Sequence, residues 1–288
     1  MSRIVDDIKL QYKIGGIANR LIYWNVGVFL LSIVFFYNFR EMSFEYPNWI
    51  MVSNNPSIVL LRPWTVLTYA FLHASFWHLF FNMLMLNFTT RLFLTYFTQK
   101  QLLGLYLLSA IFSGIIFCLS YFILGVTMNL VGASAAVIAV LVATTSYNPL
   151  MEIRLFLIGN VKLWHLTGVI LLLYLLQIGF ANTGGHIAHF AGAFFGYIYI
   201  VLLKRGTDLA SGVNSFIDFI VNLFNKKDST KFRKVYVNPK KQAEKRESRI
   251  ITKDKTQQQI DEILDKISKS GYDSLTKEEK EFLFNAGK

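Results

Sequence analysis

Residues 129–145 read NLVGASAAVIAVLVATT, an uncharged run that holds Ser134 between small residues. Within a membrane, small residues let two helices approach closely, and a serine among them commonly hydrogen-bonds to the neighbouring helix. Taken alone, Ser134 is therefore interpreted as a packing residue. Polar residues in two other apolar segments change that interpretation, because they recur at the same end of each segment.

The composition indicates a polytopic membrane domain followed by a soluble tail. The chain has 288 residues, of which 53% are hydrophobic and 16% charged, whereas an ordinary soluble domain has about 25% charged residues. Between Glu45 and Asp208 the only acidic residue is Glu152, and most Lys and Arg residues lie from Lys204 onward. Basic cytoplasmic segments account for the net charge of +11, so we expect no nucleic-acid partner.

Six apolar segments are each long enough to cross a hydrocarbon core about 30 Å thick. They predict an all-α polytopic bundle of six transmembrane helices at residues 21–39, 76–97, 101–125, 131–149, 161–180 and 185–203. No small-residue cleavage site follows the first run, so we predict no removable signal peptide. The predicted organisation is a cytoplasmic N-terminus (1–20), a membrane domain (21–205), an amphipathic helix with a basic linker (206–257) and a small helical C-terminal module (258–288).

The basic residues orient the six spans. They lie at both termini and in the connections after spans two and four, whereas the connections at 126–130 and 181–184 contain none. Because basic loops stay in the cytoplasm, we predict that both termini are cytoplasmic and that spans two, four and six enter from the outer face.

This orientation brings the candidates for chemistry to one depth. His73 and His78 lie at the start of span two, Ser134 at the start of span four, and His186 and His189 at the start of span six. Ionisable residues within spans are costly and indicate function by default. No Asp or Glu lies at this depth, so a Ser-His dyad is expected instead of a triad. Histidine would take the hydroxyl proton and later protonate the leaving amine.

Other residues supply candidate donors for an oxyanion. His78 and Asn82 are four residues apart and share one helix face, although this spacing also suits a hydrogen-bonding pair between helices. The backbone N–H of Ser134 is a third candidate, because the first N–H groups of a helix lack intrahelical partners.

A stripe of small residues on span six predicts close contact with span four. His189, Gly192 and Gly196 follow one another at i, i+3 and i+7, and such glycines let helix backbones touch. The expected partner surface on span four consists of Gly132, Ala135 and Ala136. Close contact would bring a histidine to the short serine side chain, and from spacing alone either His186 or His189 could be the base.

Three segments, in this order and spacing, together resemble the signature regions of rhomboid intramembrane serine proteases. They read HASFWHLFFN at residues 73–82, GASA at 132–135 and AHFAGAFFG at 188–196. The resemblance covers residues 15–205 and implies a rhomboid-like six-helix bundle. It implies a serine endopeptidase that cleaves peptide bonds in or next to the transmembrane segments of membrane proteins.

The resemblance also implies roles for individual residues. Ser134 takes the place of the nucleophile, and His189 takes that of the base, which selects it over His186. His78 and Asn82 take the places of the oxyanion stabilisers. The supporting positions are Gly132, His73, Gly192, Gly196 and His186.

The sequence departs from the family pattern at three points. The residue after the nucleophile is Ala135 instead of the commoner glycine, a change that still fits close packing. Some members carry a tyrosine under the catalytic histidine one turn after the nucleophile, where this chain has Ile138. We therefore expect apolar packing alone to hold the imidazole. A Trp-Arg motif found in the first loop of some members has no clear counterpart.

Such a protease needs an extended peptide bond in a wet cavity below the outer surface. A substrate helix must unwind to supply it, exposing backbone groups that hydrocarbon cannot satisfy, so helix-weakening residues near the cut and a small residue before it are expected. We expect access through span five and the connection at 181–185, where Gly184 and Gly185 permit a hinge.

The resemblance implies a bacterial inner-membrane enzyme without cofactor or metal, whose partners are transmembrane protein substrates and membrane lipids. One alternative is a catalytically inactive rhomboid-like protein that binds and routes transmembrane clients. Another is a small transporter, but transport predicts broken helices in matching halves, and we find no such repeat in the sequence.

The tail carries three further patterns. Residues 207–224 are apolar on one side and either lie along the inner membrane surface or pack on the bundle. Residues 225–257 are basic and polar, which is typical of a flexible linker. A helix with one apolar face is then expected, formed by Ile260, Ile263, Leu264 and Ile267. Residues 276–279 (TKEE) have the form of a capping box, and this helical pair resembles a module that follows some bacterial rhomboids, for which we expect binding of a cytoplasmic partner.

Overall fold

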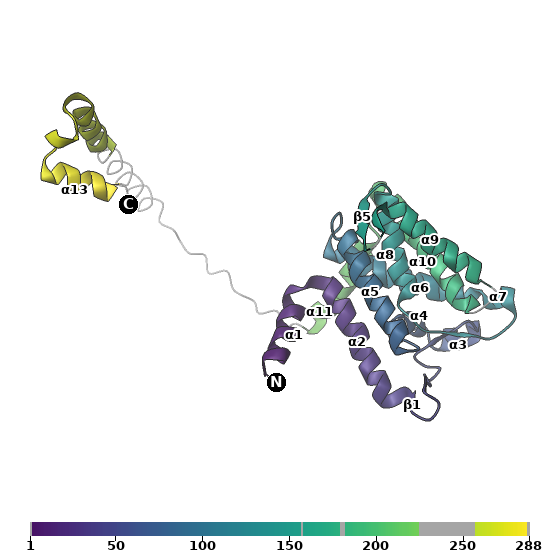
Figure 1. Cartoon of the computed structure of the whole chain (residues 1–288). Coiled ribbons are helices and arrows are strands. Elements are labelled where there is room, and N and C mark those ends of the chain that lie inside the picture. Colours follow the sequence, from purple (N-terminus) through teal and green to yellow (C-terminus); the bar gives the residue numbers. More distant parts are fainter. Residues whose placement is uncertain (1, 157, 179–181, 225–256, 287–288) are drawn as a thin grey trace. The chain divides into compact units, whose positions relative to one another are not determined.

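The computed structural model describes residues 2–156, 158–178, 182–224 and 257–286. The chain divides into two compact units, residues 1–226 and 227–288. The first unit is a bundle of helices with a few short strands in its connections (Figure 1). It confirms the predicted all-α membrane fold.

Each of the six predicted spans contains a helix, namely α2 (Gly16–Phe36), α5 (Phe76–Phe93), α6 (Gln99–Leu119), α8 (Ser134–Tyr147), α9 (Leu163–Gln177) and α10 (Thr183–Lys204). By length and composition, three described segments are long and apolar enough to cross a membrane: α2, α10, and α6 prolonged by α7 (Tyr121–Leu124). α2 begins at Gly16 instead of residue 21, because a break at Gly16, with φ 67°, separates it from α1 (Ser2–Ile14).

α8 is shorter than its predicted span. Its 14 residues rise about 21 Å at 1.5 Å per residue, against a hydrocarbon core of about 30 Å. Residues 131–133 are not helical, because Gly132 has φ 137° and the preceding residues form a strand. A helix of this length that reaches one membrane surface begins well below the other, and Ser134 is its first residue.

α8 lies inside the bundle and contacts α5, α6, α9 and α10 (Figure 1). On α10, a Cβ added to Gly192 would collide with the carbonyl of Ala135, and one added to Gly196 would collide with that of Ala139. The predicted glycine stripe therefore faces α8. Its partner surface is Ala135 with Ala139 instead of Ala136, because residues four apart share a helix face.

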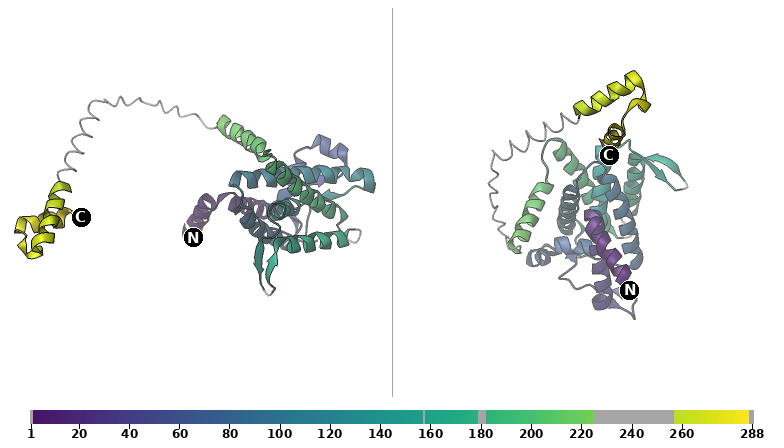
Figure 2. Two further views of the ribbon diagram at one scale, coloured as in Figure 1. Left: turned by 90° about the horizontal axis from the view of Figure 1, so that it is seen from above. Right: turned by 90° about the vertical axis from the view of Figure 1, so that its left-hand side faces the viewer.

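Short strands, which the sequence did not predict, pair in three antiparallel sheets: β1 (Tyr37–Asn38) with β2 (Ser43–Phe44), β3 (Val52–Ser53) with β4 (Asn129–Leu130), and β5 (Glu152–Leu155) with β6 (Gly159–Lys162). The first connection also holds α3 (Pro56–Leu61), α4 (Thr65–Thr68) and the 3-10 helix η1 (Tyr69–Phe71). The β5–β6 hairpin projects from the bundle in both views of Figure 2. The β3–β4 pair joins the first connection to the segment that leads into α8.

The start of α10 contradicts the predicted hinge. α10 begins at Thr183, so Gly184 and Gly185 lie buried in its first turn. Asn182 caps this turn, because its side-chain oxygen accepts a hydrogen bond from the N–H of Gly185. A side chain at Gly184 would collide with the ring of Phe117 on α6. This glycine therefore permits close packing of α10 instead of a flexible connection.

The amphipathic segment forms α11 (Ala210–Phe224), which packs on α6 through its first turns. A side chain at Gly104 would collide with Ala210, and Nδ2 of Asn214 donates to the carbonyl of Lys100 at 3.1 Å. Packing on the bundle thus accounts for one side of α11. Exposed apolar residues on the helix remain at Phe216, Phe219 and Leu223.

The second unit contains a pair of helices, residues 257–270 and α13 (Lys277–Ala286), connected through the 3-10 helix η2 (Tyr272–Ser274). Ile263 is buried, but Leu264 is 50% exposed. Adjacent residues of a helix point about 100° apart. The contact between two helices therefore buries Ile263 but not its neighbour Leu264, and the buried face is narrower than the predicted one. The predicted basic linker falls almost entirely on residues 225–256, which lie outside the described part of the chain.

The predicted capping box opens α13. The N–H of Glu279 donates to the hydroxyl of Thr276 at 3.3 Å, and the N–H of Thr276 donates to the Glu279 carboxylate at 2.8 Å. Lys266, on the other helix of the pair, donates to the same carboxylate at 2.8 Å. The hydrogen bond from Lys266, and then that from Thr276, hold the pKa of Glu279 below its ordinary value of 4.5.

Replacing Gly192 by alanine is expected to destabilise the membrane domain, because the added methyl group collides with backbone that cannot move independently. Overpacking of this kind costs about 1–3 kcal/mol. Thermal unfolding of the detergent-solubilised protein measures the effect. Gly27→Ala is the matched control, since Gly27 is a helical glycine with nothing within 4 Å of the added Cβ. Equal melting temperatures for the two variants would contradict the close contact.

Because the pKa of Glu279 is lowered in the fold, its contribution to stability is present above pH 4.5 and is lost as the pH falls through the lowered pKa. Hydrogen-exchange protection factors for α13 in the full chain should therefore fall with acidification over that range. Glu279→Gln keeps a capping acceptor but does not titrate, so its protection should be lower at neutral pH and lack this acid transition. An identical transition in the variant would assign it to another group.

Candidate active site

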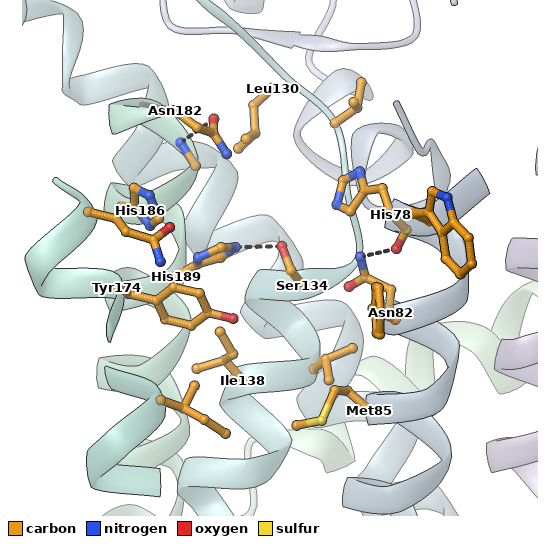
Figure 3. Close-up of a pocket in the computed structure, with 17 residues that line it drawn as sticks. His78, Asn82, Met85, Leu130, Ser134, Ile138, Tyr174, Asn182, His186 and His189 are labelled. Atoms are coloured by element: carbon orange, nitrogen blue, oxygen red, sulfur yellow. Dashed lines mark hydrogen bonds between the residues drawn. The ribbon is translucent and has the colours of Figure 1, made fainter. Parts of the chain in front are cut away.

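A cavity of about 520 Å³ lies between the helices on one side of the bundle, with walls from α5, α8, α9 and α10. Among its lining residues are five of the sequence candidates, which are His78, Asn82, Ser134, His186 and His189. In Figure 3, Ser134 lies between His189 on one side and His78 with Asn82 on the other. The structure therefore brings these residues, from three separate spans, to one site.

Ser134 and His189 are in direct contact. The Oγ of Ser134 and the Nε2 of His189 are 2.6 Å apart, a hydrogen-bonding distance at which the imidazole can accept the hydroxyl proton. The contact depends on the packing of Gly192 against Ala135, because the serine side chain is short and both helices must approach for it to reach the ring. His189 is 9% exposed, whereas Ser134 is half-buried and lines the cavity.

The other ring nitrogen of His189 has no hydrogen-bonding partner among the described protein groups. Catalytic histidines are commonly oriented by a carboxylate at this position, and the acid-poor membrane segment supplies none. The imidazole is instead contacted by two rings. The ring centroid of Tyr174 lies 4.3 Å away, and that of His186 lies 5.7 Å away in a T-shaped arrangement.

Tyr174 corrects the expectation that apolar packing alone holds the imidazole. Ile138 does occupy the position one turn after Ser134, and it packs with Tyr174 in one apolar cluster. The aromatic ring beside the histidine, however, comes from α9 instead of α8 (Figure 3). Sequence reasoning missed it, because no motif identifies one tyrosine in an apolar span as a neighbour of a residue on another helix.

His186 is 4% exposed, so it is buried and does not face water. Its ring contacts both Tyr174, at a centroid distance of 5.6 Å, and His189. His186 thus belongs to the wall of the cavity, whereas the hydrogen bond to Ser134 comes from His189.

His78 presents an N–H donor on the opposite side of Ser134. The N–H of Ala74 donates to Nδ1 of His78 at 3.3 Å, which in the neutral ring leaves the proton on Nε2. The ring of buried His73 contacts that of His78 in a T-shaped arrangement, with centroids 5.2 Å apart. Asn82 uses one amide hydrogen on the carbonyl of His78, at 2.8 Å, and its second remains available.

Gly132 lies next to His78 instead of on the surface that faces α10. A Cβ at Gly132 would lie 2.9 Å from Cε1 of His78, and its φ of 137° is one that other residues rarely adopt. Its N–H donates to the carbonyl of Tyr69 at 2.9 Å. Both the backbone turn into α8 and the approach of His78 therefore require a glycine.

Asn54 fixes the segment that leads into α8, and sequence reasoning missed it as well. It is fully buried. Its Nδ2 donates to the carbonyl of Val126 at 2.8 Å, its Oδ1 accepts from the N–H of Met128 at 2.7 Å, and its own N–H donates to the Met128 carbonyl. Next to this contact, β3 pairs with β4. The first connection thereby satisfies backbone groups just before Ser134.

No group of three or more His, Cys, Asp or Glu residues suited to hold a metal ion occurs among the described residues. The donor set of the cavity consists of a hydroxyl, imidazoles and amides. Such a set can deprotonate a nucleophile and stabilise an oxyanion, which together suit acyl transfer.

Comparison with known families gives two matches. The model of the rhomboid domain matches residues 61–206, about half of the chain, and this range contains every cavity residue discussed above. A family of unknown function (DUF6576) matches residues 251–285. No curated protein matches the chain.

Asn54→Ala is expected to release the segment before α8, because it removes both side-chain hydrogen bonds from Asn54 to the backbone of Val126 and Met128, each with a typical net value of about 0.5–1.5 kcal/mol. Hydrogen exchange over residues 126–133 should accelerate, as measured by mass spectrometry. The neighbouring variant Asn55→Ala removes only the cap of α3 and should leave that segment protected. Similar exchange in both variants would contradict the assignment.

Proposed function

The chain belongs to the rhomboid family, and we propose that it is an active intramembrane serine endopeptidase in which Ser134 is the nucleophile and His189 the general base. The observation that supports this most directly is the 2.6 Å separation between the Ser134 oxygen and the Nε2 atom of His189. A family member that only bound transmembrane clients would have no need for this contact.

In the proposed reaction, Nε2 of His189 removes the hydroxyl proton while Oγ of Ser134 attacks the carbonyl carbon of the scissile bond. The carbonyl oxygen becomes an oxyanion. As this intermediate collapses, His189 passes the proton to the leaving nitrogen, and the C–N bond breaks to give an acyl-enzyme. Water, deprotonated by His189, then attacks the ester carbonyl. The bond between the acyl carbon and Oγ of Ser134 breaks as His189 returns the proton to Oγ, which releases the second product and restores the hydroxyl.

The oxyanion is proposed to form between α8 and α5. Nε2–H of His78 and the second amide hydrogen of Asn82 lie on one side of Ser134, and the backbone N–H of Ser134 belongs to the first turn of its helix, where intrahelical acceptors are lacking. A single donor of this kind typically contributes about 2.7–4 kcal/mol to transition-state stabilisation.

The proposed substrate is a peptide segment that has left its own transmembrane helix. Apolar side chains, including Trp77, Phe81, Met85 and Ile170, line the cavity beside the polar cluster. An unwound segment could bury apolar side chains here while its carbonyl approaches Ser134. Residues that weaken a helix should favour cleavage, because backbone groups unpaired in hydrocarbon are costly.

We further propose that the protein lies in a bacterial inner membrane with both termini in the cytoplasm, following the distribution of its basic loops. The cavity then faces the outer half of the bilayer. The C-terminal unit, which contains no described cluster suited to hold a metal, is proposed to bind a cytoplasmic partner.

Ser134→Ala should abolish both cleavage of a reporter transmembrane substrate and covalent labelling by a serine-directed fluorophosphonate. His189→Ala should reduce both below detection, because no other base contacts the hydroxyl among the described residues. His186→Ala should retain a substantial part of each, since it removes only a ring that flanks the base.

If His186→Ala abolished cleavage and labelling while His189→Ala retained them, His186 would be identified as the base. A wild-type protein that neither reacts with the probe nor cleaves any transmembrane segment would favour the client-binding alternative. Comparing membrane-protein fragments in cells with and without the Ser134→Ala variant would identify substrates.

A further inference from the structure

We propose that Tyr174 of α9 is a positioning residue for His189, so that the helix forming one wall of the cavity also aligns the catalytic base. This inference rests on the proposed function. It assigns a role to a residue outside the three motifs that carry the family resemblance.

A histidine ring needs an external restraint to hold its plane. The torsion that turns an imidazole about its Cβ–Cγ bond has broad minima, and a hydrogen bond at each ring nitrogen usually restricts it. In His189, Nε2 has the Ser134 hydroxyl, while Nδ1 is buried without a described protein partner. One hydrogen bond leaves the ring free to rotate about the line to the serine oxygen.

The contact with Tyr174 supplies the missing restraint. Its ring centroid lies 4.3 Å from that of His189, and the two planes are inclined by 44°. Figure 3 shows the tyrosine ring beneath the imidazole, on the side of Ile138. His186 flanks His189 at 5.7 Å and is itself 5.6 Å from the tyrosine. Rotation of the imidazole would drive its edge into one of these rings.

Tyr174 reaches the site from a helix with few buried residues. In α9, only Leu163 and Thr167 are buried, and Oγ1 of Thr167 lies 2.7 Å from Oγ1 of Thr145 on α8. Further along α9, Leu171 and Tyr174 pack on a small cluster of α8 and α10 residues. Tyr174 therefore both contacts the base and, with Leu171, packs α9 on this part of the bundle.

The test compares purified full-length variants in two assays, cleavage of a reporter transmembrane substrate and the rate of fluorophosphonate labelling of Ser134. Tyr174→Phe keeps the ring and should retain most activity. Tyr174→Leu removes it, and kcat and the labelling rate should fall about 2- to 12-fold, the value of one aromatic contact, with KM little changed. The double variant Ile138→Tyr, Tyr174→Leu should recover part of kcat, because it supplies a ring from α8.

Leu171→Ala is the matched control. Leu171 packs in the same cluster one turn earlier on α9 and is not a lining residue of the cavity, so it reports the loosening of α9 without loss of the ring. Its kcat and labelling rate should stay close to those of the wild type. An equal fall in Leu171→Ala and Tyr174→Leu would show that Tyr174 only holds the helix in place.

Two other outcomes would also overturn the inference. A rise in KM with unchanged kcat and labelling in Tyr174→Leu would make the tyrosine a substrate contact. Wild-type rates in Tyr174→Leu would remove any role for the ring in alignment. These results require a wild-type protein that is labelled and cleaves its reporter, whereas a wild type inert in both assays would instead refute the proposed protease activity.

Discussion

The contact between the backbones of α8 and α10 is the constraint on which the site depends. Serine has a side chain of one carbon and one oxygen, so its hydroxyl reaches a ring on another helix only if the two helices touch. Gly192 and Gly196 allow this, because their missing side chains leave room for the carbonyls of Ala135 and Ala139. The apolar environment offers little hydrophobic force between helices, so packing of this closeness is itself a source of stability.

A second constraint follows from the length of α8. Since the helix is too short to cross the hydrocarbon core alone, the chain before Ser134 must enter the membrane region without helical hydrogen bonds. Such backbone is tolerated only where protein satisfies it. Asn54, the β3–β4 pair and the carbonyl of Tyr69 provide those partners. The first connection is therefore a structural part of the site, although it contributes no proposed catalytic group.

Periodicity and spacing predicted the features that arise within one element or between two motifs. The six spans follow from the length of the apolar runs. The helical face shared by His78 and Asn82 and the glycine stripe follow from spacings of three or four residues, and the stripe indicated which helices meet. The start of α8 was not predictable in the same way. The apolar sequence before Ser134 is compatible with a helix, but residues 129–130 form β4 and Gly132 has a positive φ. The partners of Asn54 and Tyr174 are far apart in the sequence, and no local pattern links them.

The missing carboxylate explains why the surroundings of His189 matter more than in a triad. A carboxylate would fix the tautomer, orient the ring and stabilise the imidazolium, but a charge buried in hydrocarbon is costly. A ring contact orients the imidazole without adding a charge. It cannot stabilise the imidazolium to the same degree, so a dyad of this kind relies more on oxyanion donors and on substrate positioning. In this chain the proposed orienting ring belongs to α9, and a substrate segment that displaced α9 to enter the cavity would also disturb the alignment of the proposed base. For the proposed protease, efficient cleavage would then require α9 to return before proton transfer, which would favour substrates that unwind into the cavity over those that hold the bundle open.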